Sequence, residues 1–366
     1  MPVEIGIDSR MIFSSGIGTY IRGLTSQYNN LKRPADWRFT LAGAENPVYA
    51  GFQFQKFKAP IYSLTEQLQY PGILKKFDLW HTPHYNVPFF KPKTKLVATI
   101  HDLIHWVFRG KFFSPLQAAY AKTMIQKALA NSAHIITVSQ KTKSDLLEYF
   151  GAKENQVSVI YEGTSPDFRP LPAEDVQQAL VRYRLPKKYF FYVGLLKPHK
   201  NVLWLVRLFR RLFQERKINS PLVILGRKDK HYSAELRELA ALDREPAVIY
   251  LPKIQKGDLP FLYNGATALV HPSLYEGFGL TLLESMACGT PVAAFRTASI
   301  PEVAGDAAFL HEVNDEEAMA ETLQKLESSE DLQEEYRQKG FKQVQKFQWV
   351  DAARQTLDVY QKVLEI

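Results

Sequence analysis

Short apolar runs alternate with longer amphipathic stretches along the whole chain, and no other feature constrains the fold as strongly. The apolar runs of the first half are rich in β-branched residues and bounded by turn residues: VEIGID, WRFTLAG, KLVATIHD, HIITVS and VSVIYEG. Such runs are typical of strands buried on both faces of a parallel sheet. The stretches between them, such as SPLQAAYAKTMIQKALANS, have helical periodicity. The pattern predicts an α/β fold with doubly wound sheets.

The alternation starts again after a segment rich in proline and turn residues, GTSPDFRPLPAED. The later apolar runs are YFFYVGLL, PLVILG, AVIYLP, ATALVHPS and PVAAF. Because 366 residues exceed what one hydrophobic core usually holds, we expect two domains joined by that linker. We place the first domain at residues 1–168 and the second at 169–346, and we expect the amphipathic stretch 347–366 to form a final helix.

The stretch HPSLYEGFGLTLLESMACGTP, residues 271–291, carries the most specific chemical pattern. It predicts a strand, a turn containing Gly277 and Gly279, and then a helix. The first amides of such a helix suit a phosphate group, and the glycines let a ligand approach the backbone closely. Glu276 in the loop suits a polyol or a developing cation, and Glu284 in the second helical turn suits the paired hydroxyls of a ribose. Together these groups describe a nucleotide sugar, although two glutamates at this spacing are also common on exposed helices.

The segment PSLYEGFGLTLLESMACGTPV resembles the signature of the retaining glycosyltransferases of family 4, also called glycosyltransferase group 1, which have the GT-B fold. The resemblance extends to SGIGTYIRGL, ATIHDLIH, ITVSQKTKSDLL, YVGLLKPHKN, ASIPEVAGDAAFL and the closing FQWVDAARQTLDVY. It implies two Rossmann-like domains facing a central cleft, with the C-terminal helix crossing back to the N-terminal domain. It also implies that the second domain binds a nucleotide-sugar donor, that the first binds the acceptor, and that a hexose is transferred with retained anomeric configuration.

The resemblance also implies roles for individual residues. Glu276, His101 and Lys200 are the candidates for catalysis: the first two would orient the departing sugar, and Lys200 would stabilise the charge of the leaving diphosphate. Candidates for donor binding are Gly16, Gly18, Gly277, Phe278, Gly279, Leu280, Thr281 and Glu284.

Several of these residues have ordinary alternatives. Gly16 and Gly18 precede a helix pattern and could form a plain tight turn, and a single histidine such as His101 is more often structural than catalytic. Related enzymes often carry an arginine close to the position of Lys200, and none stands there in this sequence. Arg227 or Lys228, after the strand PLVILG, is our candidate for the second cation on the diphosphate.

The sequence contains no D-x-D motif and no clustered His or Cys spacing, so we expect neither a metal ion nor a cofactor. The single cysteine, Cys288, excludes an intrachain disulfide, which agrees with a cytoplasmic location, and we assign it no chemistry. No window of about 18 apolar residues is present, and the N-terminus lacks the features of a signal peptide.

The net charge of +8 is distributed unevenly, because residues 1–170 hold 20 Lys and Arg against 12 Asp and Glu. Basic residues are interleaved with phenylalanine in FQKFKAP, LKKF, FFKPKTK and FRGKFF. This mixture suits the surface of an anionic membrane, so we expect peripheral contact with its inner face and a lipid-linked glycan as acceptor. In the alternative, these phenylalanines belong to the core and the lysines are merely solvated.

Three other readings remain open at this point. A nicotinamide-dependent oxidoreductase would need a G-x-G-x-x-G loop with a downstream acid, which the sequence lacks. A nucleic-acid-binding protein would explain the charge but would leave both glutamates without a role, so we expect no nucleic-acid partner. Among sugar donors, GDP-mannose is our first choice for a surface-polysaccharide enzyme, and a UDP-sugar used on a soluble acceptor is the alternative.

Overall fold

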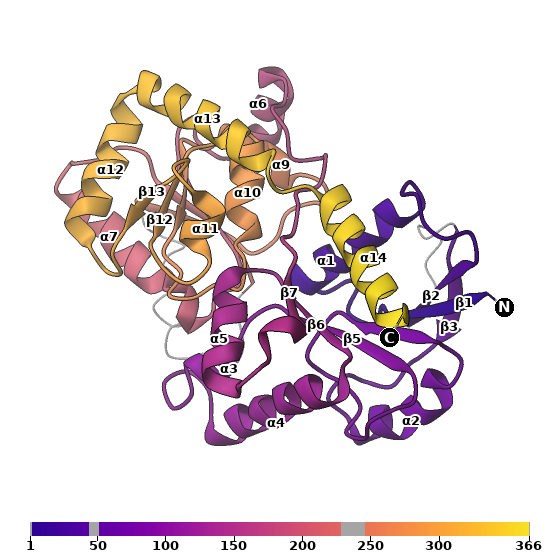
Figure 1. Cartoon of the computed structure of the whole chain (residues 1–366). Coiled ribbons are helices and arrows are strands. Elements are labelled where there is room, and N and C mark those ends of the chain that lie inside the picture. Colours follow the sequence, from indigo (N-terminus) through magenta and orange to yellow (C-terminus); the bar gives the residue numbers. More distant parts are fainter. Residues whose placement is uncertain (1, 44–50, 228–245, 366) are drawn as a thin grey trace. The chain divides into compact units, whose positions relative to one another are not determined.

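The computed structural model describes residues 2–43, 51–227 and 246–365. Its contacts divide the chain into two compact units, each with its own parallel sheet. Unit 1 comprises Met1–Gly163 together with Phe347–Ile366, and unit 2 comprises Thr164–Lys346. The expected α/β fold with two Rossmann-like sheets is confirmed (Figure 1).

Unit 1 is built on a seven-stranded sheet in the order β3-β2-β1-β4-β5-β6-β7. The strands are β1 (Val3–Asp8), β2 (Trp37–Gly43), β3 (Gln53–Lys56), β4 (Leu79–Thr82), β5 (Lys95–Ile100), β6 (His134–Thr137) and β7 (Val157–Val159). The helices are α1 (Gly16–Tyr28), α2 (Leu64–Leu74), α3 (Ile104–Val107), α4 (Pro115–Asn131), α5 (Gln140–Phe150) and α14 (Trp349–Glu365). Helices α1 and α14 cover one face of the sheet, and α2 and α4 lie on the other (Figure 1).

The chain returns to unit 1 at its end, as the family resemblance implied, because α14 packs on α1. Gly23 makes this approach possible, since a Cβ at that position would lie 2.3 Å from the ring of Trp349. The helix is also tied to the sheet by a buried hydrogen bond of 2.6 Å between the Tyr360 hydroxyl and His81 Nδ1. At the end of α14, the Lys95 ammonium donates to the carbonyls of Val363 and Leu364 at 2.9 and 3.2 Å.

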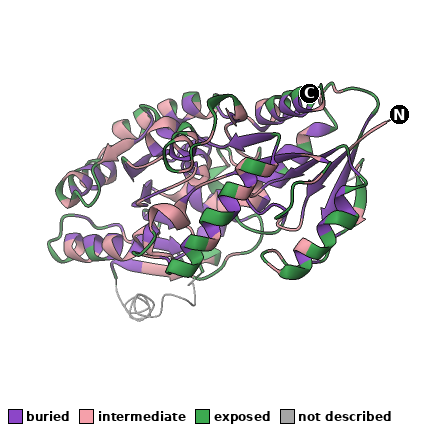
Figure 2. Ribbon diagram, turned by 60° about the horizontal axis from the view of Figure 1, so that its bottom comes forward, coloured by how far each residue is buried: buried purple, intermediate pink, exposed green. Residues whose placement is uncertain are grey.

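Unit 2 is built on a six-stranded parallel sheet in the order β10-β9-β8-β11-β12-β13. Its strands are β8 (Phe190–Val193), β9 (Leu222–Leu225), β10 (Val248–Leu251), β11 (Ala268–His271), β12 (Val292–Phe295) and β13 (Phe309–His311). Its helices are α6 (Ala173–Arg182), η2 (Pro198–Lys200, a single 3-10 turn), α7 (Val202–Gln214), α9 (Leu259–Gly265), α10 (Leu280–Ala287), α11 (Ile300–Ala304), α12 (Glu316–Ser328) and α13 (Glu330–Val344). The strands are largely buried, whereas the helices alternate buried and exposed faces (Figure 2).

The division between the units falls at Gly163, whereas the sequence analysis placed it at residue 168. The intervening residues belong with unit 2 because the ring of Phe168 packs edge-on against Tyr263, with ring centroids 5.8 Å apart. In addition, the backbone N–H of Leu171 donates to Asn264 Oδ1 at 2.9 Å. The proline-rich linker is therefore anchored to α9 over its second half.

Candidate active site

In unit 2, a lysine, a glutamate and a histidine from three segments meet in one hydrogen-bonded group. Strand β11 ends at the buried His271, Glu276 follows in the loop before α10, and Lys200 is the last residue of η2. The Lys200 ammonium lies 2.6 and 2.7 Å from the two carboxylate oxygens of Glu276. His271 Nε2 lies 3.0 Å from Glu276 Oε1. Lys200 and Glu276 are two residues that the sequence selected, and the fold brings them into direct contact.

The carboxylate of Glu276 remains ionised in this setting. Burial alone would raise the pKa of Glu276, but the charge of Lys200 and the hydrogen bond from His271 outweigh it and hold the pKa well below its usual value. Glu276 is therefore a fixed negative charge over the neutral pH range, paired with a cation on one side and an imidazole on the other.

The loop that carries Glu276 is held by its backbone. The buried hydroxyl of Ser299 lies 2.9 Å from the carbonyl oxygen of Glu276 and 2.7 Å from that of Phe278. The backbone N–H of Leu274 donates to the carbonyl of His199, next to Lys200, at 2.8 Å. These bonds fix the distance between the two charged side chains without using their charged atoms.

Helix α10 begins directly after the loop, with Gly279 as its N-cap. Gly279 has φ +112°, a backbone conformation that an L side chain rarely adopts, and it offers no side chain to cap the helix. The first amides of α10 at Leu280 and Thr281 therefore lack a side-chain cap from Gly279 and carry the positive end of the helix dipole. The arrangement suits an anionic group, as the sequence pattern suggested.

Glu284 lies in the second turn of α10, and its Oε2 accepts a hydrogen bond of 2.9 Å from the hydroxyl of Tyr263 on α9. Burial, together with this carboxylate, raises the pKa of Tyr263 well above its usual value, so the hydroxyl stays protonated as a donor. Burial raises the pKa of the nearby Cys288 thiol to about 12, with a further contribution from Glu284. Cys288 is thus a buried, protonated thiol.

The ends of strands β8 and β9 come very close together beside the Lys200 segment. A Cβ on Gly226 would lie 1.9 Å from the carbonyl oxygen of Gly194, so this contact requires glycine. The next residue, Arg227, is exposed, and its carbonyl accepts a hydrogen bond of 3.1 Å from the N–H of Leu196. The backbone of Arg227 therefore lies beside the turn that leads to Lys200. Lys228, the other candidate for a second cation, falls outside the described residues.

In unit 1, His101 is held by two acceptors. Its Nδ1 lies 3.1 Å from Glu162 Oε1 and its Nε2 lies 3.1 Å from the carbonyl oxygen of Pro83. Both ring nitrogens of His101 therefore face an oxygen atom, and Glu162 is itself buried. The edge of the Tyr20 ring packs against His101 with centroids 4.9 Å apart.

The two glycines near the N-terminus differ in their surroundings. Helix α1 begins at Gly16, so both residues lie in its first turn instead of in a loop ahead of it. A Cβ on Gly18 would lie 2.5 Å from the carbonyl oxygen of Ile12, whereas a Cβ on Gly16 would meet nothing within 4 Å. The first turn of α1 packs closely against the preceding loop. This contact explains why residue 18 is a glycine, but it does not explain the glycine at position 16.

The sequence analysis missed a second polar cluster in unit 1. Arg10, two residues beyond β1, pairs with Asp8 and with the fully buried Glu66, whose Oε1 lies 2.6 Å from Arg10 Nη2. Asn86 donates to the other carboxylate oxygen of Glu66 and accepts from the Tyr120 hydroxyl at 3.0 Å. The cluster was not predicted because its members are far apart in the sequence and match no spacing rule.

Aromatic rings border this cluster. The half-exposed ring of Tyr62 packs edge-on against His84 and against Tyr120, with centroids 5.7 and 5.8 Å apart. Rings together with buried planar hydrogen-bonding groups are the usual lining of sites for polar organic ligands. We refer to Arg10, Glu66, Asn86, Tyr62 and Tyr120 as the Arg10 cluster.

Also missed were His271, Tyr263 and Glu162, each of which contacts a residue that the sequence did select. His271 had a usable signal, since it ends a strand five residues before Glu276. Tyr263 and Glu162 gave none, because their partners are 21 and 61 residues away.

Comparison with known proteins gives a consistent family assignment. Residues 23–168 match the family model described as Glycosyltransferase Family 4, and residues 178–343 match the one described as Glycosyl transferases group 1. The O-antigen chain mannosyltransferase B of Escherichia coli is 29% identical over 285 residues, which cover 77% of this chain and 74% of that one. The O-antigen chain mannosyltransferase RfbU of Salmonella typhimurium is 25% identical over 68% of this chain and 65% of its own length.

Among solved structures, that of Anabaena HepE in complex with UDP and glucose has a TM-score of 0.79 and 16% sequence identity, and it covers 98% of this chain and 100% of that one. At this identity the likeness concerns the fold, and the two parallel sheets agree with it.

Proposed function

The chain belongs to glycosyltransferase family 4, the glycosyl transferases group 1, and from this premise we propose that it transfers mannose from GDP-mannose, with retained anomeric configuration, to a lipid-linked glycan during surface-polysaccharide synthesis. It is a glycosyltransferase with the GT-B fold. The choice of mannose is supported by relatives that are O-antigen mannosyltransferases. A second candidate, transfer from a UDP-sugar to a soluble acceptor, is favoured by the likeness to a structure that holds UDP and glucose.

The observation that carries the proposal is the group formed by Lys200, Glu276 and His271. In unit 2, the diphosphate of the donor would lie against the Lys200 ammonium and the first amides of α10. Breaking the bond between sugar and phosphate builds negative charge on the leaving diphosphate, which these groups stabilise. The ionised Glu276, whose pKa is held well below its usual value, would stabilise the positive charge that develops on the departing sugar.

Glu284 would bind the ribose hydroxyls in this arrangement. The Tyr263 hydroxyl donates to one of its oxygens and orients the carboxylate, a group whose two oxygens match the paired hydroxyls of a ribose. The assignment applies equally to GDP and UDP donors, so it does not depend on the choice of sugar. Arg227 would add the second cation on the diphosphate.

Unit 1 would bind the acceptor through the Arg10 cluster and through His101 with its partner Glu162. A lipid-linked acceptor is supported by the excess of basic residues in residues 1–170. No helix of the described residues is long and apolar enough to cross a bilayer.

Titration calorimetry with GDP, GDP-mannose, UDP and UDP-glucose tests the donor assignment. We expect GDP and GDP-mannose to bind, and Glu284→Ala to weaken GDP binding by about 1.5–3 kcal/mol, roughly 10- to 150-fold, because a hydrogen bond to a charged group is lost. Tyr263→Phe, which keeps the carboxylate but removes its orienting hydroxyl, should weaken GDP binding by only about 0.5–1.5 kcal/mol.

Two results would decide against parts of this proposal. Selective binding of UDP and UDP-glucose would favour the second candidate function. If Glu284→Ala bound every nucleotide with unchanged affinity, Glu284 would not bind the ribose.

A further inference from the structure

Five of the large apolar side chains that are exposed in unit 1 lie on two helices and one loop. Leu64 and Leu68 on α2 are 80% and 79% exposed, and Leu116 on α4 is 80% exposed. Phe89 and Phe90, in the loop between β4 and β5, are each 40% exposed. Leu64 and Leu68 are four residues apart and so lie on the same side of α2. Single exposed apolar residues are common on proteins, but a group of them indicates an interaction surface.

Hydrogen bonds hold the loop between the two helices. Gln67 of α2 accepts from the backbone N–H of Phe89 at 2.9 Å, and its amide lies 3.4 Å from the carbonyl of Val87. Asn131, at the end of α4, donates to the carbonyls of Pro88 and Phe90 at 2.8 and 3.1 Å. The loop is therefore attached to both helices.

The beginnings of the two helices are also close. The ring of Tyr62, two residues before α2, contacts that of Tyr120, one turn after Leu116 on α4. Helices α2 and α4 lie on the same side of the sheet (Figure 1). We call the surface of Leu64, Leu68, Phe89, Phe90 and Leu116 the α2–α4 face.

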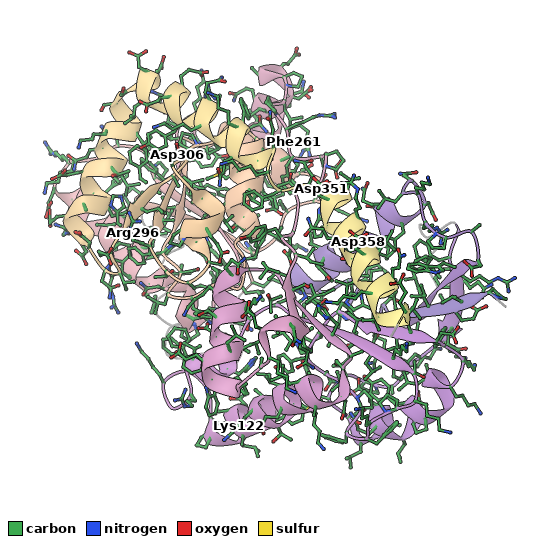
Figure 3. The ribbon with its side chains drawn as sticks, viewed as in Figure 1. Lys122, Phe261, Arg296, Asp306, Asp351 and Asp358 are labelled. Carbon is green, nitrogen blue, oxygen red and sulfur yellow. The ribbon has the colours of Figure 1, made fainter. Side chains whose placement is uncertain are left out.

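The charge around the α2–α4 face has a single sign. The three segments that form the face, residues 64–74, 83–94 and 115–131, contain four lysines and one acid. The one acid of α2, Glu66, is fully buried against Arg10, and α4 contains none. Lys91 and Lys93 are exposed directly after the two phenylalanines, and Lys122 lies on α4 (Figure 3).

The structure narrows the set of residues that the sequence proposed for membrane contact. Phe57 and Phe77 are 1% and 8% exposed and belong to the core. Lys95 is engaged with the last carbonyls of α14 and is unsuited to binding a headgroup. Lys91 and Lys93 remain, together with the two phenylalanines that precede them.

We propose that the α2–α4 face binds peripherally to an anionic bilayer, with its leucines and phenylalanines in the interfacial layer and its lysines at the headgroups. Exposed apolar side chains combined with bases and without acids match a negatively charged interface, whereas a protein partner would not require the absence of acids. Binding of this face to a membrane does not depend on the proposed function, but its use in bringing a lipid-linked acceptor to the enzyme does. Tyr62 joins this face to the Arg10 cluster, so a lipid-linked acceptor would reach the cluster while its lipid stays in the bilayer.

Co-sedimentation with vesicles of phosphatidylcholine, with and without 30% phosphatidylglycerol, tests the inference. The wild-type protein should bind only the anionic vesicles, and binding should fall as salt rises. Changing Lys91 and Lys93 to Gln should weaken binding roughly thirtyfold, because each base near the surface contributes about a factor of five. Changing Leu64 and Leu68 to Ser should also release the protein, and because both are exposed, folding should be unaffected.

Matched controls lie on unit 2. Lys253→Gln with Lys256→Gln, and Val181→Ser, alter exposed residues that are not part of this face and should leave vesicle binding unchanged. Equal binding by the leucine variant and the controls would overturn the proposal. The proposal would also be overturned if the protein formed a dimer without lipid and the leucine changes dissociated that dimer. In that case a second copy of the chain would cover the face. GDP affinity in solution should be the same for all these variants. A failure of the donor assignment can therefore be distinguished from a failure of membrane binding.

Discussion

At the scale of single residues, the proposed chemistry depends on the carboxylate of Glu276, whose pKa its neighbours hold well below the usual value. Glu276→Gln keeps the shape of the side chain but removes the charge that Lys200 and His271 face. We expect the variant to fold, to bind GDP, and to lose about 10²–10³ in kcat, the usual effect of removing one preorganised electrostatic group. Steady-state kinetics with the preferred donor measures the loss, and circular dichroism with GDP calorimetry provides the control. A kcat close to that of the wild type would contradict the role of Glu276.

The pattern of 271–291 was sufficient to select Glu276 and Glu284, because both lie within one strand–loop–helix segment whose geometry is local. It could not supply Ser299, which fixes the loop, or Tyr263, which orients Glu284, since these contacts depend on how β12, α11 and α9 pack around α10. The same limit applies to His101. Its position directly after β5 could be predicted from the sequence, but its partner Glu162, which follows β7, could not.

At the scale of elements, strands that lie in a separate apolar run were predicted, including the three-residue β7, whereas β3, β4 and β13 were not. Strand β4 (Leu79–Thr82) has only four residues and follows Lys75, Lys76 and Asp78, so it shows no separate apolar run. It is a central strand because β1 and β5 pair with it on both sides. Strand β3, at the edge of the sheet, is mostly exposed and has no burial pattern to detect.

The link between α14 and the sheet predicts sensitivity of unit 1 to acid. Burial, with a smaller contribution from His101, lowers the pKa of His81 to about 3, while in the unfolded chain it stays near 6.5. Between these values only the unfolded chain binds the proton, so this residue makes stability fall by about 1.4 kcal/mol for each pH unit below about 6.5. Burial also lowers the pKa of His84 to about 3 and that of His134 to about 4, so these residues add to the slope. Urea titrations at pH 7.5, 6 and 5 should show the summed slope, and His81→Gln should make it shallower.

Tryptophan fluorescence is a suitable signal for those titrations because it reports mainly on unit 1. Four of the five tryptophans lie in unit 1, at positions 37, 80, 106 and 349, and Trp204 lies in unit 2. Tyr360→Phe, which removes the hydroxyl bonded to His81 but keeps the titrating ring, is the matched control and should lower stability with little change in slope. Equal slopes for the wild type and His81→Gln would show that His81 does not titrate on unfolding.

At the scale of the whole molecule, two doubly wound units could be predicted because each repeats the same alternation of apolar runs and helices. The boundary could not be predicted to the residue, because the linker contains Phe168, whose attachment to α9 is a tertiary contact. The return of the chain to unit 1 was predicted only through the family resemblance, since an amphipathic stripe at 347–366 does not reveal which surface it covers.

This return predicts that the two units respond differently to loss of the C-terminus. Removing residues 347–366 takes away eight buried residues of α14, including Trp349, Leu357, Tyr360 and Val363, and uncovers α1 around Gly23. Burial of one large apolar side chain contributes about 1.5–3 kcal/mol, and a domain has only about 5–15 kcal/mol of stability, so unit 1 should unfold or nearly so. The core of unit 2 lies within Thr164–Lys346 and should persist. Hydrogen exchange followed by mass spectrometry should therefore show lost protection in peptides before Gly163 and retained protection after it, and the truncated protein should still bind GDP. Uniform loss of protection would mean that unit 2 depends on α14 for its own stability.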